Sequence, residues 1–497
     1  MDVIIIVLSV MLAYVLVKHL LLSRDRGKNL PPGPFQLPII GNLTNLGKLP
    51  HRSLAKLSQN YGPIMHLQLG RVTTIVISSS AIAQQVFQKK GRAFSRRFIP
   101  DSLCACDHSL YSFVWLPIGP QWRNLRKISN SNLFSANKLD ANQHLRGRKV
   151  NELIAYVQKC SQTGDAVDIG RAAFRTSFNL LSNTVFSKDM VDPYQDSAQE
   201  FKDLAWNIMV EAGSPNLVDY FPVLKKMDPQ GVKRRMTGYF QKVIKMLDGL
   251  INERLALKGS GTTVDKTDML DELINISQVN PNEMDKILME HLFVDIFVAG
   301  TDTTSNTVEW GMAEILRSTE TMMKVKAELR HLVGKGVILE EGDIYRLPFL
   351  QCIVRETLRL HPPFPLLLPR QTEEETELNG YTIPKNSQVL VNAWAIGRDP
   401  VSWKNPSSFR PERFLDSEVD VKGQDFELIP FGAGIRICPG LPLVMRMVPV
   451  MLGSLINCFD WELEGGIPLN ELDMEEKCGL SVAKLHPLRV LATSQVV

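Results

Sequence analysis

One short loop constrains this chain more than any other stretch, because it places a cysteine among glycines just before an apolar run of helical length. The loop spans 430–440, Pro-Phe-Gly-Ala-Gly-Ile-Arg-Ile-Cys-Pro-Gly, and contains Cys438. Glycines allow backbone conformations that are closed to residues with a Cβ, so amide N–H groups can turn toward a sulfur atom. The loop therefore favours a metal-bound thiolate at Cys438. The alternative is a free cysteine buried in a turn, which would require neither the glycines nor the arginine two residues before it.

The loop also resembles the haem-binding pattern F-x-x-G-x-R-x-C-x-G of the cytochrome P-450 family of haem-thiolate monooxygenases. The matching residues are Phe431, Gly434, Arg436, Cys438 and Gly440. This resemblance implies that the chain binds haem b (iron protoporphyrin IX) with Cys438 as the metal ligand, and a thiolate ligand favours O–O cleavage. It also implies that Phe431 shields the sulfur and that Arg436 faces a haem propionate, because a guanidinium fork matches a carboxylate.

Length and composition favour one large domain over several small ones. The 497 residues contain no internal repeat, and no low-complexity linker follows position 35. With the family resemblance, we expect a mainly α fold with a small β-sheet region, forming a single haem domain over 35–497. The net charge of +3 gives no sign of nucleic-acid binding, and seven cysteines without paired metal-ligand spacing favour a reducing compartment.

The amino terminus predicts a membrane anchor over residues 1–22. The apolar run from Val3 to Leu22 reaches the length of about twenty residues that a bilayer crossing needs. Basic residues follow it within a basic, proline-rich hinge at 23–34, so the positive-inside rule places the remaining chain in the cytosol. We expect a single-pass protein of the endoplasmic reticulum membrane, as in the microsomal members of the resembled family. A cleaved signal peptide is the alternative, although no small-residue cleavage site follows the apolar core.

Two further segments have clear local patterns. Residues 66–69 and 72–77 flank Gly70-Arg71 and predict a β-hairpin. Residues 284–316 have a helical pattern throughout, but the stretch 299–304, Ala-Gly-Thr-Asp-Thr-Thr, has poor helix propensity. We expect a local distortion there, with a hydroxyl bonding back to the preceding turn; the alternative is a tolerated kink without function.

The family resemblance assigns roles to several residues outside the cysteine loop. Asp302 and Thr303 match the acid–alcohol pair that relays protons during oxygen activation. Trp122 and Arg126 match a W-x-x-x-R pair that donates to a haem propionate, and Arg370 matches a third propionate contact. Without the resemblance, the segment around Trp122 would be a basic surface helix with one packed tryptophan.

A second arginine group has an expected structural role. Glu356 and Arg359 form the family's E-x-x-R pair, and Arg413 supplies the second arginine of its buried cluster. Removing one member of such a cluster leaves another charge uncompensated, so we expect these residues to hold the fold.

By the same resemblance, substrate contacts should come from five stretches whose residues are mostly apolar or small. These stretches are 97–113, 205–216, 293–298, 364–368 and 480–482. An apolar pocket with few polar anchors suits a prenyl or terpene chain. The runs 391–400, 425–430 and 472–477 look like the plant terpenoid hydroxylases that include geraniol 8-hydroxylase.

The expected reaction is therefore hydroxylation of a small apolar plant metabolite, a terpenoid or prenyl chain, with O2. No P-loop or Rossmann signature is present, so electrons from NADPH should arrive through a separate NADPH–cytochrome P-450 reductase. Membrane lipid is the other expected partner. Diterpenoid or alkaloid hydroxylation, a haem-thiolate isomerase or dehydratase, and a haem sensor or carrier remain as alternatives.

Overall fold

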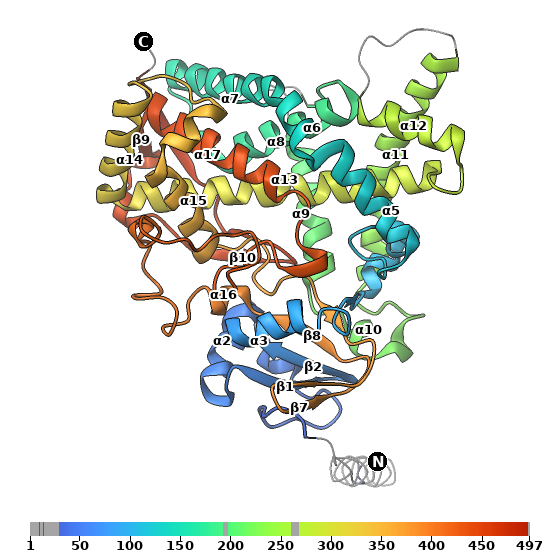
Figure 1. Ribbon diagram of the computed structural model, residues 1–497. Coiled ribbons are helices and arrows are strands. Elements are labelled where there is room, and N and C mark those ends of the chain that lie inside the picture. The colour runs from blue at the N-terminus through green and yellow to red at the C-terminus, as the bar shows by residue number, and fades with distance from the viewer. Residues whose placement is uncertain (1–8, 10–12, 14–28, 192–196, 260–267, 496–497) are drawn as a thin grey trace, which may run out of the picture.

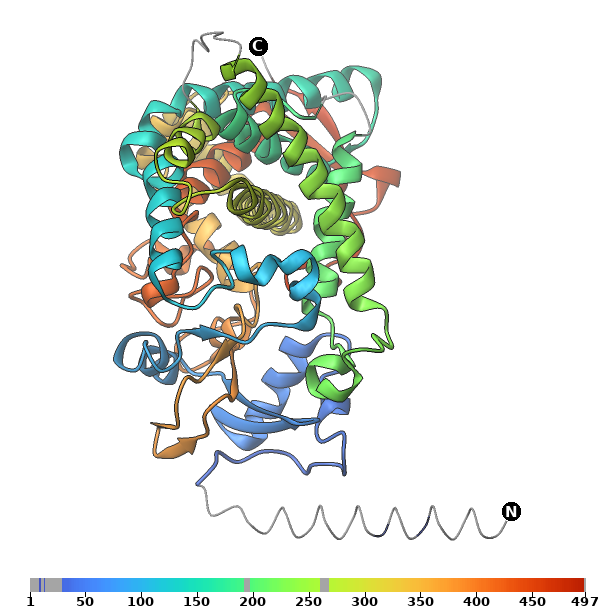
Figure 2. The same cartoon turned by 90° about the vertical axis from the view of Figure 1, so that its right-hand side faces the viewer.

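The longest described helix, α13 (Lys286–Arg317), runs through the helical part of the molecule. It is drawn in yellow near the centre of Figure 1, and Figure 2 shows it nearly end-on with other helices around it. The computed structural model describes residues 29–191, 197–259 and 268–495, together with Ser9 and Ala13. The sequence-based prediction of a helix over 284–316 is confirmed, and Asp285 caps it by accepting a hydrogen bond from the amide of Leu288 at 2.7 Å.

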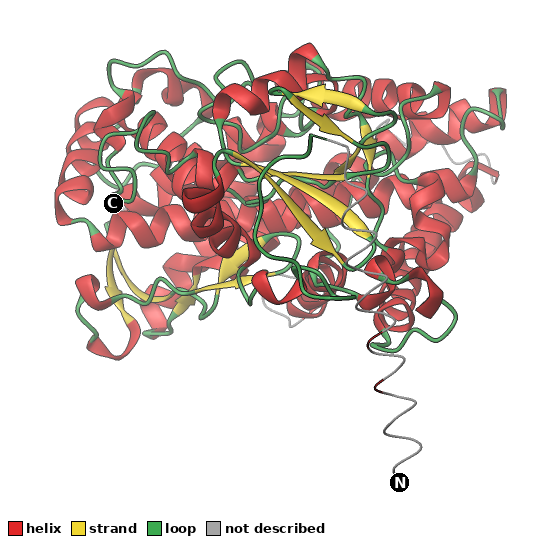
Figure 3. Cartoon of the chain, turned by 90° about the horizontal axis from the view of Figure 1, so that it is seen from below, coloured by secondary structure: helices red, strands yellow, loops and turns green. Residues whose placement is uncertain are grey.

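Helices make up most of the described chain, as the red ribbons of Figure 3 show. The α-helices besides α13 are α2 (Pro50–Tyr61), α3 (Ser80–Gln84), α4 (His108–Tyr111), α5 (Pro120–Ser129), α6 (Ala136–Ala141), α7 (Gln143–Thr163), α8 (Ile169–Phe186), α9 (Ser197–Gly213), α10 (Leu217–Tyr220), α11 (Val232–Gly259), α12 (Met269–Val279), α14 (Thr319–Leu332), α15 (Pro348–Leu360), α16 (Ala393–Ile396) and α17 (Leu441–Cys458). The predicted mainly α class is confirmed.

The strands are short and form small sheets. They are β1 (Ile64–Leu69), β2 (Val72–Ile77), β3 (Arg96–Arg97), β4 (Val167–Asp168), β5 (Arg370–Gln371), β6 (Thr376–Leu378), β7 (Tyr381–Ile383), β8 (Gln388–Val391), β9 (Phe459–Leu463), β10 (Glu476–Cys478), β11 (Val482–Lys484) and β12 (Arg489–Ser494). The predicted hairpin is confirmed as the antiparallel pair β1–β2.

The largest sheet brings distant parts of the chain together. Its strand order is β1-β2-β8-β5-β3, and β2 and β8 run parallel. The antiparallel register of β3 and β5 places Arg97 directly opposite Arg370. Like charges directly opposite each other destabilise a sheet, so this pairing calls for a compensating negative charge.

Helix α13 links two large apolar clusters. Its first half packs with α8, α9 and α11 in one cluster, and its second half packs with α15 and α17 in the other. Gly300 sits at the contact with α8, where a Cβ would lie 2.9 Å from Leu181 Cδ1. The helix is thereby held from both sides, which fixes the direction of its cavity-facing side chains.

The predicted structural cluster is present, and its central pair, Glu356 and Arg359, is fully buried. Arg359 donates to the two Glu356 carboxylate oxygens at 2.7 and 2.8 Å, and Arg413 Nε donates to Glu356 Oε1 at 3.0 Å. This network joins α15 to the segment 410–414.

The predicted anchor at 1–22 lies outside the described residues except for Ser9 and Ala13, and the predicted hinge at 23–34 is described only from Asn29 onward. Within the described chain, one helix, α17, is long and apolar enough to cross a membrane. However, 67% of it is buried inside the protein, and it packs against α7, α13, α14 and α15. It is therefore a core helix, and its apolar composition is the helix-length run that follows Cys438.

Candidate active site

The cysteine loop is closed by its own backbone. The amide of Cys438 donates to the carbonyl of Phe431 at 3.0 Å, and Gly434–Arg436 forms a short 3-10 turn between them. Gly434 has φ +68°, and a Cβ there would lie 2.5 Å from the Phe87 carbonyl oxygen. Only glycine fits this position, which explains why the loop needs that residue.

The sulfur of Cys438 lies at the amino-terminal end of α17. Burial raises the pKa of the Cys438 thiol, while the amides of Gly440 and Leu441 and the charge of Arg126 act in the opposite direction. Amide N–H groups and a nearby cation stabilise a thiolate. The loop therefore supplies a sulfur that faces amide N–H groups able to stabilise a thiolate.

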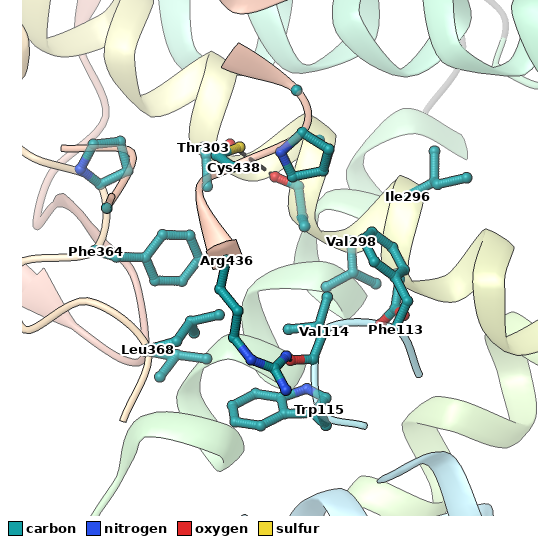
Figure 4. A pocket seen from close by; sticks show the side chains of 18 of the residues that line it. Phe113, Val114, Trp115, Ile296, Val298, Thr303, Phe364, Leu368, Arg436 and Cys438 are labelled. Atoms are coloured by element: carbon teal, nitrogen blue, oxygen red, sulfur yellow. Dashed lines mark hydrogen bonds between the residues drawn. The ribbon is translucent and has the colours of Figure 1, made fainter. Parts of the chain in front are cut away.

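Cys438 lines a cavity of about 260 Å³. Figure 4 shows Thr303, Phe364, Leu368 and Arg436 around the same cavity, with the Arg436 side chain extending toward Val114 and Trp115. Phe431 and Gly440 also line it. The structure thus brings together the predicted residues of the cysteine loop and of helix α13.

Four buried or half-buried arginines line this cavity, and they donate to backbone carbonyls. Arg126 donates to Ile437 at 2.8 Å, Arg370 to Phe94 at 2.9 Å and Arg436 Nε to Ser95 at 2.6 Å. Arg97 donates to Val114 at 3.2 Å and to Leu368 at 3.1 Å. Among the described residues no carboxylate forms an ion pair with any of these four side chains, which we call the arginine cluster.

The electrostatics of the arginine cluster favour an anionic ligand. Burial, and then repulsion from Arg436, lowers the pKa of Arg370 to about 9. Burial also lowers the pKa of Arg436 to about 10, with Glu373 opposing this without an ion pair. For Arg97, burial and then the charges of Arg370 and Arg436 hold the pKa well below its usual value. Buried charges require partners, and the two propionates of haem carry the charge that the cluster lacks, so the cavity fits the expected haem.

Trp122 completes this wall. It is buried, lines the cavity, and lies under the Arg436 guanidinium, whose Cζ is 5.2 Å from the indole ring centre. The structure therefore brings Trp122, Arg126, Arg370 and Arg436 together at one cavity. The sequence pattern places Arg97 only in a stretch expected to contact substrate, because no sequence signal indicates that β3 pairs with β5.

Thr303 and Asp302 are neighbours in sequence but face different surroundings. Thr303 lines the cavity, and its hydroxyl donates to the Ala299 carbonyl at 2.7 Å. Asp302 is buried and accepts from the Ser481 hydroxyl at 2.8 Å and from Asn306 Nδ2 at 3.2 Å. Burial raises the pKa of Asp302, although Ser481 and two lysines, Lys202 and Lys477, oppose this shift.

The back-bonding hydroxyls expected in this stretch are present, since Thr301 and Thr304 also donate to carbonyls one turn earlier, at 2.6 and 2.9 Å. The expected distortion of the helix is not observed, because α13 is continuous through residues 299–304. The threonine hydroxyls add hydrogen bonds to the helix without displacing its amide ladder. Room beside the helix comes instead from Ala299, with its single methyl group, and from Gly300, which has no side chain; both residues line the cavity.

All five predicted substrate stretches contribute to the cavity wall. Examples are Leu103, Ile208, Val298, Phe364 and Leu480. Other aromatic or apolar side chains join them from outside these stretches, among them Phe134, Leu181 and Phe240. The wall is mainly apolar, as the sequence predicted.

One polar group in this wall could not be recognised from the sequence. His108 and Asp295 line the cavity from α4 and α13, and His108 Nε2 lies 3.3 Å from Asp295 Oδ1. Both lie within predicted stretches, but their proximity depends on how α4 packs against α13. Residue type alone did not distinguish them from surface residues.

Comparisons with known proteins agree with this geometry. The family model described as cytochrome P450 matches residues 31–486. Geraniol 8-hydroxylase of Swertia mussotii is 62% identical over 468 residues, covering 94% of each chain. Geraniol 8-hydroxylase of Catharanthus roseus is 57% identical, covering 99% of this chain and 100% of the relative. A geranylhydroquinone 3''-hydroxylase of Arnebia euchroma is 51% identical over 98% of both chains.

Proposed function

Because this chain belongs to the cytochrome P450 family and is a haem-dependent monooxygenase, we propose that it hydroxylates an acyclic terpenoid or prenyl chain such as that of geraniol. The observation that carries this proposal is the mainly apolar cavity beside Cys438. Burial of apolar surface, about 25 cal/mol per Å², is the main source of affinity for a hydrocarbon chain. Relatives named for geraniol and geranylhydroquinone support the same substrate class.

Bound haem supplies the redox centre that activates O2 with electrons from NADPH. We propose that the Cys438 sulfur would bind the haem iron, with Phe431 and Gly440 sheltering the sulfur. The amides of Gly440 and Leu441 hydrogen-bond the thiolate and so tune its basicity. Trp122, Arg126, Arg370 and Arg436 hold the propionates, and Arg97 joins them from β3.

We propose that Asp302 and Thr303 deliver the protons that oxygen activation requires. The Thr303 hydroxyl can both donate and accept, so it can hold a water at the cavity wall. Because burial raises the pKa of Asp302, this carboxyl keeps a proton more readily than an exposed aspartate does. Asp302 lies on the Ser481 side of α13, from which a proton can be replaced without opening the substrate cavity.

We propose that NADPH–cytochrome P-450 reductase is the electron donor and that the protein is a single-pass protein of the endoplasmic reticulum membrane with a cytosolic catalytic domain. Arg123 and Lys127 are exposed on α5, the helix whose Arg126 contacts the cysteine loop. Exposed cations near the haem ligand suit an acidic redox partner. Protease added to intact microsomes should digest the catalytic domain, and full protection would contradict this orientation.

The proposed substrate class is tested with membranes that contain the protein and its reductase. Geraniol, prenylated phenols and diterpenes are supplied with NADPH, and products are identified by mass spectrometry. We expect NADPH-dependent addition of one oxygen to the acyclic prenyl compounds. Conversion without NADPH would indicate an isomerase or dehydratase, and turnover of diterpenes alone would overturn the acyclic substrate.

The proton role is tested by Thr303→Ala. Positioned proton transfer contributes typically about 10²–10⁴-fold, so product formed per NADPH should fall strongly while haem content and substrate binding persist. Thr301→Ala is the matched control, because it removes the same kind of back-bonding hydroxyl at a buried position that does not line the cavity. Full coupling in Thr303→Ala would show that the proton arrives by another route.

A further inference from the structure

Asp295 stands alone among the described residues that line the cavity, because it is the only carboxylate there, and His108 is the only imidazole. Both side chains are buried, at 6% and 3% exposure. No lysine or arginine of the described chain forms an ion pair with Asp295. Burying a carboxylate in a mainly apolar wall costs free energy unless hydrogen-bond donors surround it.

The protein satisfies this carboxylate only in part. The Ser112 hydroxyl lies 2.7 and 2.8 Å from the two carboxylate oxygens, and His108 Nε2 lies 3.3 Å from Oδ1. A hydroxyl donates a single proton, whereas a carboxylate has about four acceptor sites. Acceptor capacity therefore remains on Asp295 at the cavity wall.

His108 is itself held in position by two neighbours. Its Nδ1 lies 2.9 Å from Nδ1 of His291, and its ring packs against Phe240 with centroids 4.6 Å apart. Burial, and then the neighbouring His108 ring, lowers the pKa of His291 to about 4, which keeps His291 neutral near pH 7. The Asp295–His108 pair is thus a fixed feature of the wall.

Asp295 also shares a helical stripe with the proposed catalytic threonine. Residues 295, 299 and 303 are spaced four apart, so they lie along one face of α13. Asp295, Ala299 and Thr303 all line the cavity. At 1.5 Å per residue, Asp295 and Thr303 are about 12 Å apart along the helix axis, and the small Ala299 side chain lies between them.

We infer that Asp295, positioned by His108 and Ser112, binds the hydroxyl of a prenyl alcohol and directs oxidation to the far end of its chain. This inference rests on the proposed function. An extended chain advances about 3.5 Å for every three bonds, so the eight bonds from the hydroxyl oxygen of geraniol to its terminal methyl carbon span roughly 9 Å. With the hydroxyl at Asp295, the terminal methyl group therefore comes near the Thr303 end of the stripe.

The test compares geraniol with its hydroxyl-free hydrocarbon counterpart in the haem-loaded enzyme. Dissociation constants come from the spectral shift on substrate binding, and products are identified with NADPH and reductase. A hydrogen bond to a charged group accounts for about 10- to 100-fold in affinity, so we expect the wild type to prefer geraniol by that factor. In Asp295→Asn, whose neutral amide oxygen accepts a weaker hydrogen bond, this preference should fall to a few-fold, and oxidation should spread to several carbons.

Two further variants separate an anchor from a structural residue. Ile296→Val changes a neighbouring apolar residue of the wall, so it should change both affinities by a similar factor and leave the preference intact. His108→Gln should weaken the preference without abolishing it. Carbon monoxide spectra confirm that each variant holds haem.

The outcomes distinguish this inference from the function on which it rests. Equal affinities of the wild type for alcohol and hydrocarbon, with geraniol still oxidised, would overturn the anchor alone. An unchanged preference and a single product in Asp295→Asn would do the same. If no prenyl compound binds or turns over, both proposals are wrong.

Discussion

Two groups of arginines in the protein interior differ in the source of the negative charge that balances them. Arg359 and Arg413 share the fully buried Glu356, so each of these arginines has an ion-pair partner within the chain. The arginine cluster at the cavity donates only to backbone carbonyls and repels itself, as the lowered pKa values of Arg370 and Arg436 indicate. The first group has a carboxylate partner without any ligand, whereas the second requires an anionic ligand to balance its charge.

This difference separates scaffold from site on physical grounds. A charge whose partner is in the protein stabilises one packing arrangement, whereas a cluster of like charges remains costly until an anion arrives. The Glu356 network joins α15 to residues 410–414, and the arginine cluster gathers β3, β5, α5 and the cysteine loop around one cavity. Haem binding should therefore stabilise the second region far more than the first.

The largest effect is expected for Glu356→Ala. It leaves Arg359 and Arg413 buried without a counter-charge, which costs about 3–5 kcal/mol. The free energy of unfolding, measured with urea, should fall by that amount whether or not haem is present. Glu320→Ala is the control, because Glu320 is 73% exposed and pairs with Lys324 on the surface. Such exposed pairs contribute less than about 1 kcal/mol, and equal losses in the two variants would contradict the structural role of Glu356.

A smaller effect is expected at Glu476, a second carboxylate with partners inside the protein. Although burial opposes it, pairing with His51 and Arg52 lowers the pKa of Glu476 to about 2. Because the folded-state pKa is below the unfolded value near 4.3, the stabilisation is complete above that value and is lost as the pH falls toward 2. Glu476→Gln should therefore lower the free energy of unfolding by about 3 kcal/mol at pH 7. The difference from the wild type should shrink below about pH 4.3, and a constant difference down to pH 3 would argue against this shift.

The smallest effect concerns Arg97, which belongs to the cluster completed by a ligand. In Arg97→Ala, loss of one charge-assisted contact should speed transfer of haem to an acceptor protein by about tenfold. The haem-free protein should not lose stability, since a repelling buried charge has been removed. The adjacent Arg96 is exposed on the same strand, so Arg96→Ala should change neither property. Destabilisation of haem-free Arg97→Ala as large as that of Glu356→Ala would remove the distinction between the two clusters.

The sequence predicted best what is local along the chain. Phe431, Arg436, Cys438 and Gly440 belong to one loop whose geometry is set by its own glycines and backbone, so a short pattern was enough. The long helix was predicted within two residues, because its pattern and its capping Asp285 are also local.

Features that depend on packing between segments far apart in the sequence could not be predicted in this way. Arg97 reaches the cluster only because β3 pairs with β5, a contact between segments more than 270 residues apart. The pairing of His108 with Asp295 depends on α4 packing against α13. The expected distortion near Thr303 was wrong because propensity describes an isolated helix, whereas α13 is held by neighbours on both sides.

The identity of the metal ligand is tested most directly by the spectrum of the reduced protein with carbon monoxide. We predict that the wild type absorbs near the wavelength for which the family is named, and that Cys438→Ala loses this band together with oxygenation. Cys352→Ala, which removes a thiol buried in α15, should keep the band. A normal band in Cys438→Ala would show that another residue supplies the thiolate, and would contradict the assignment on which the proposed site is built.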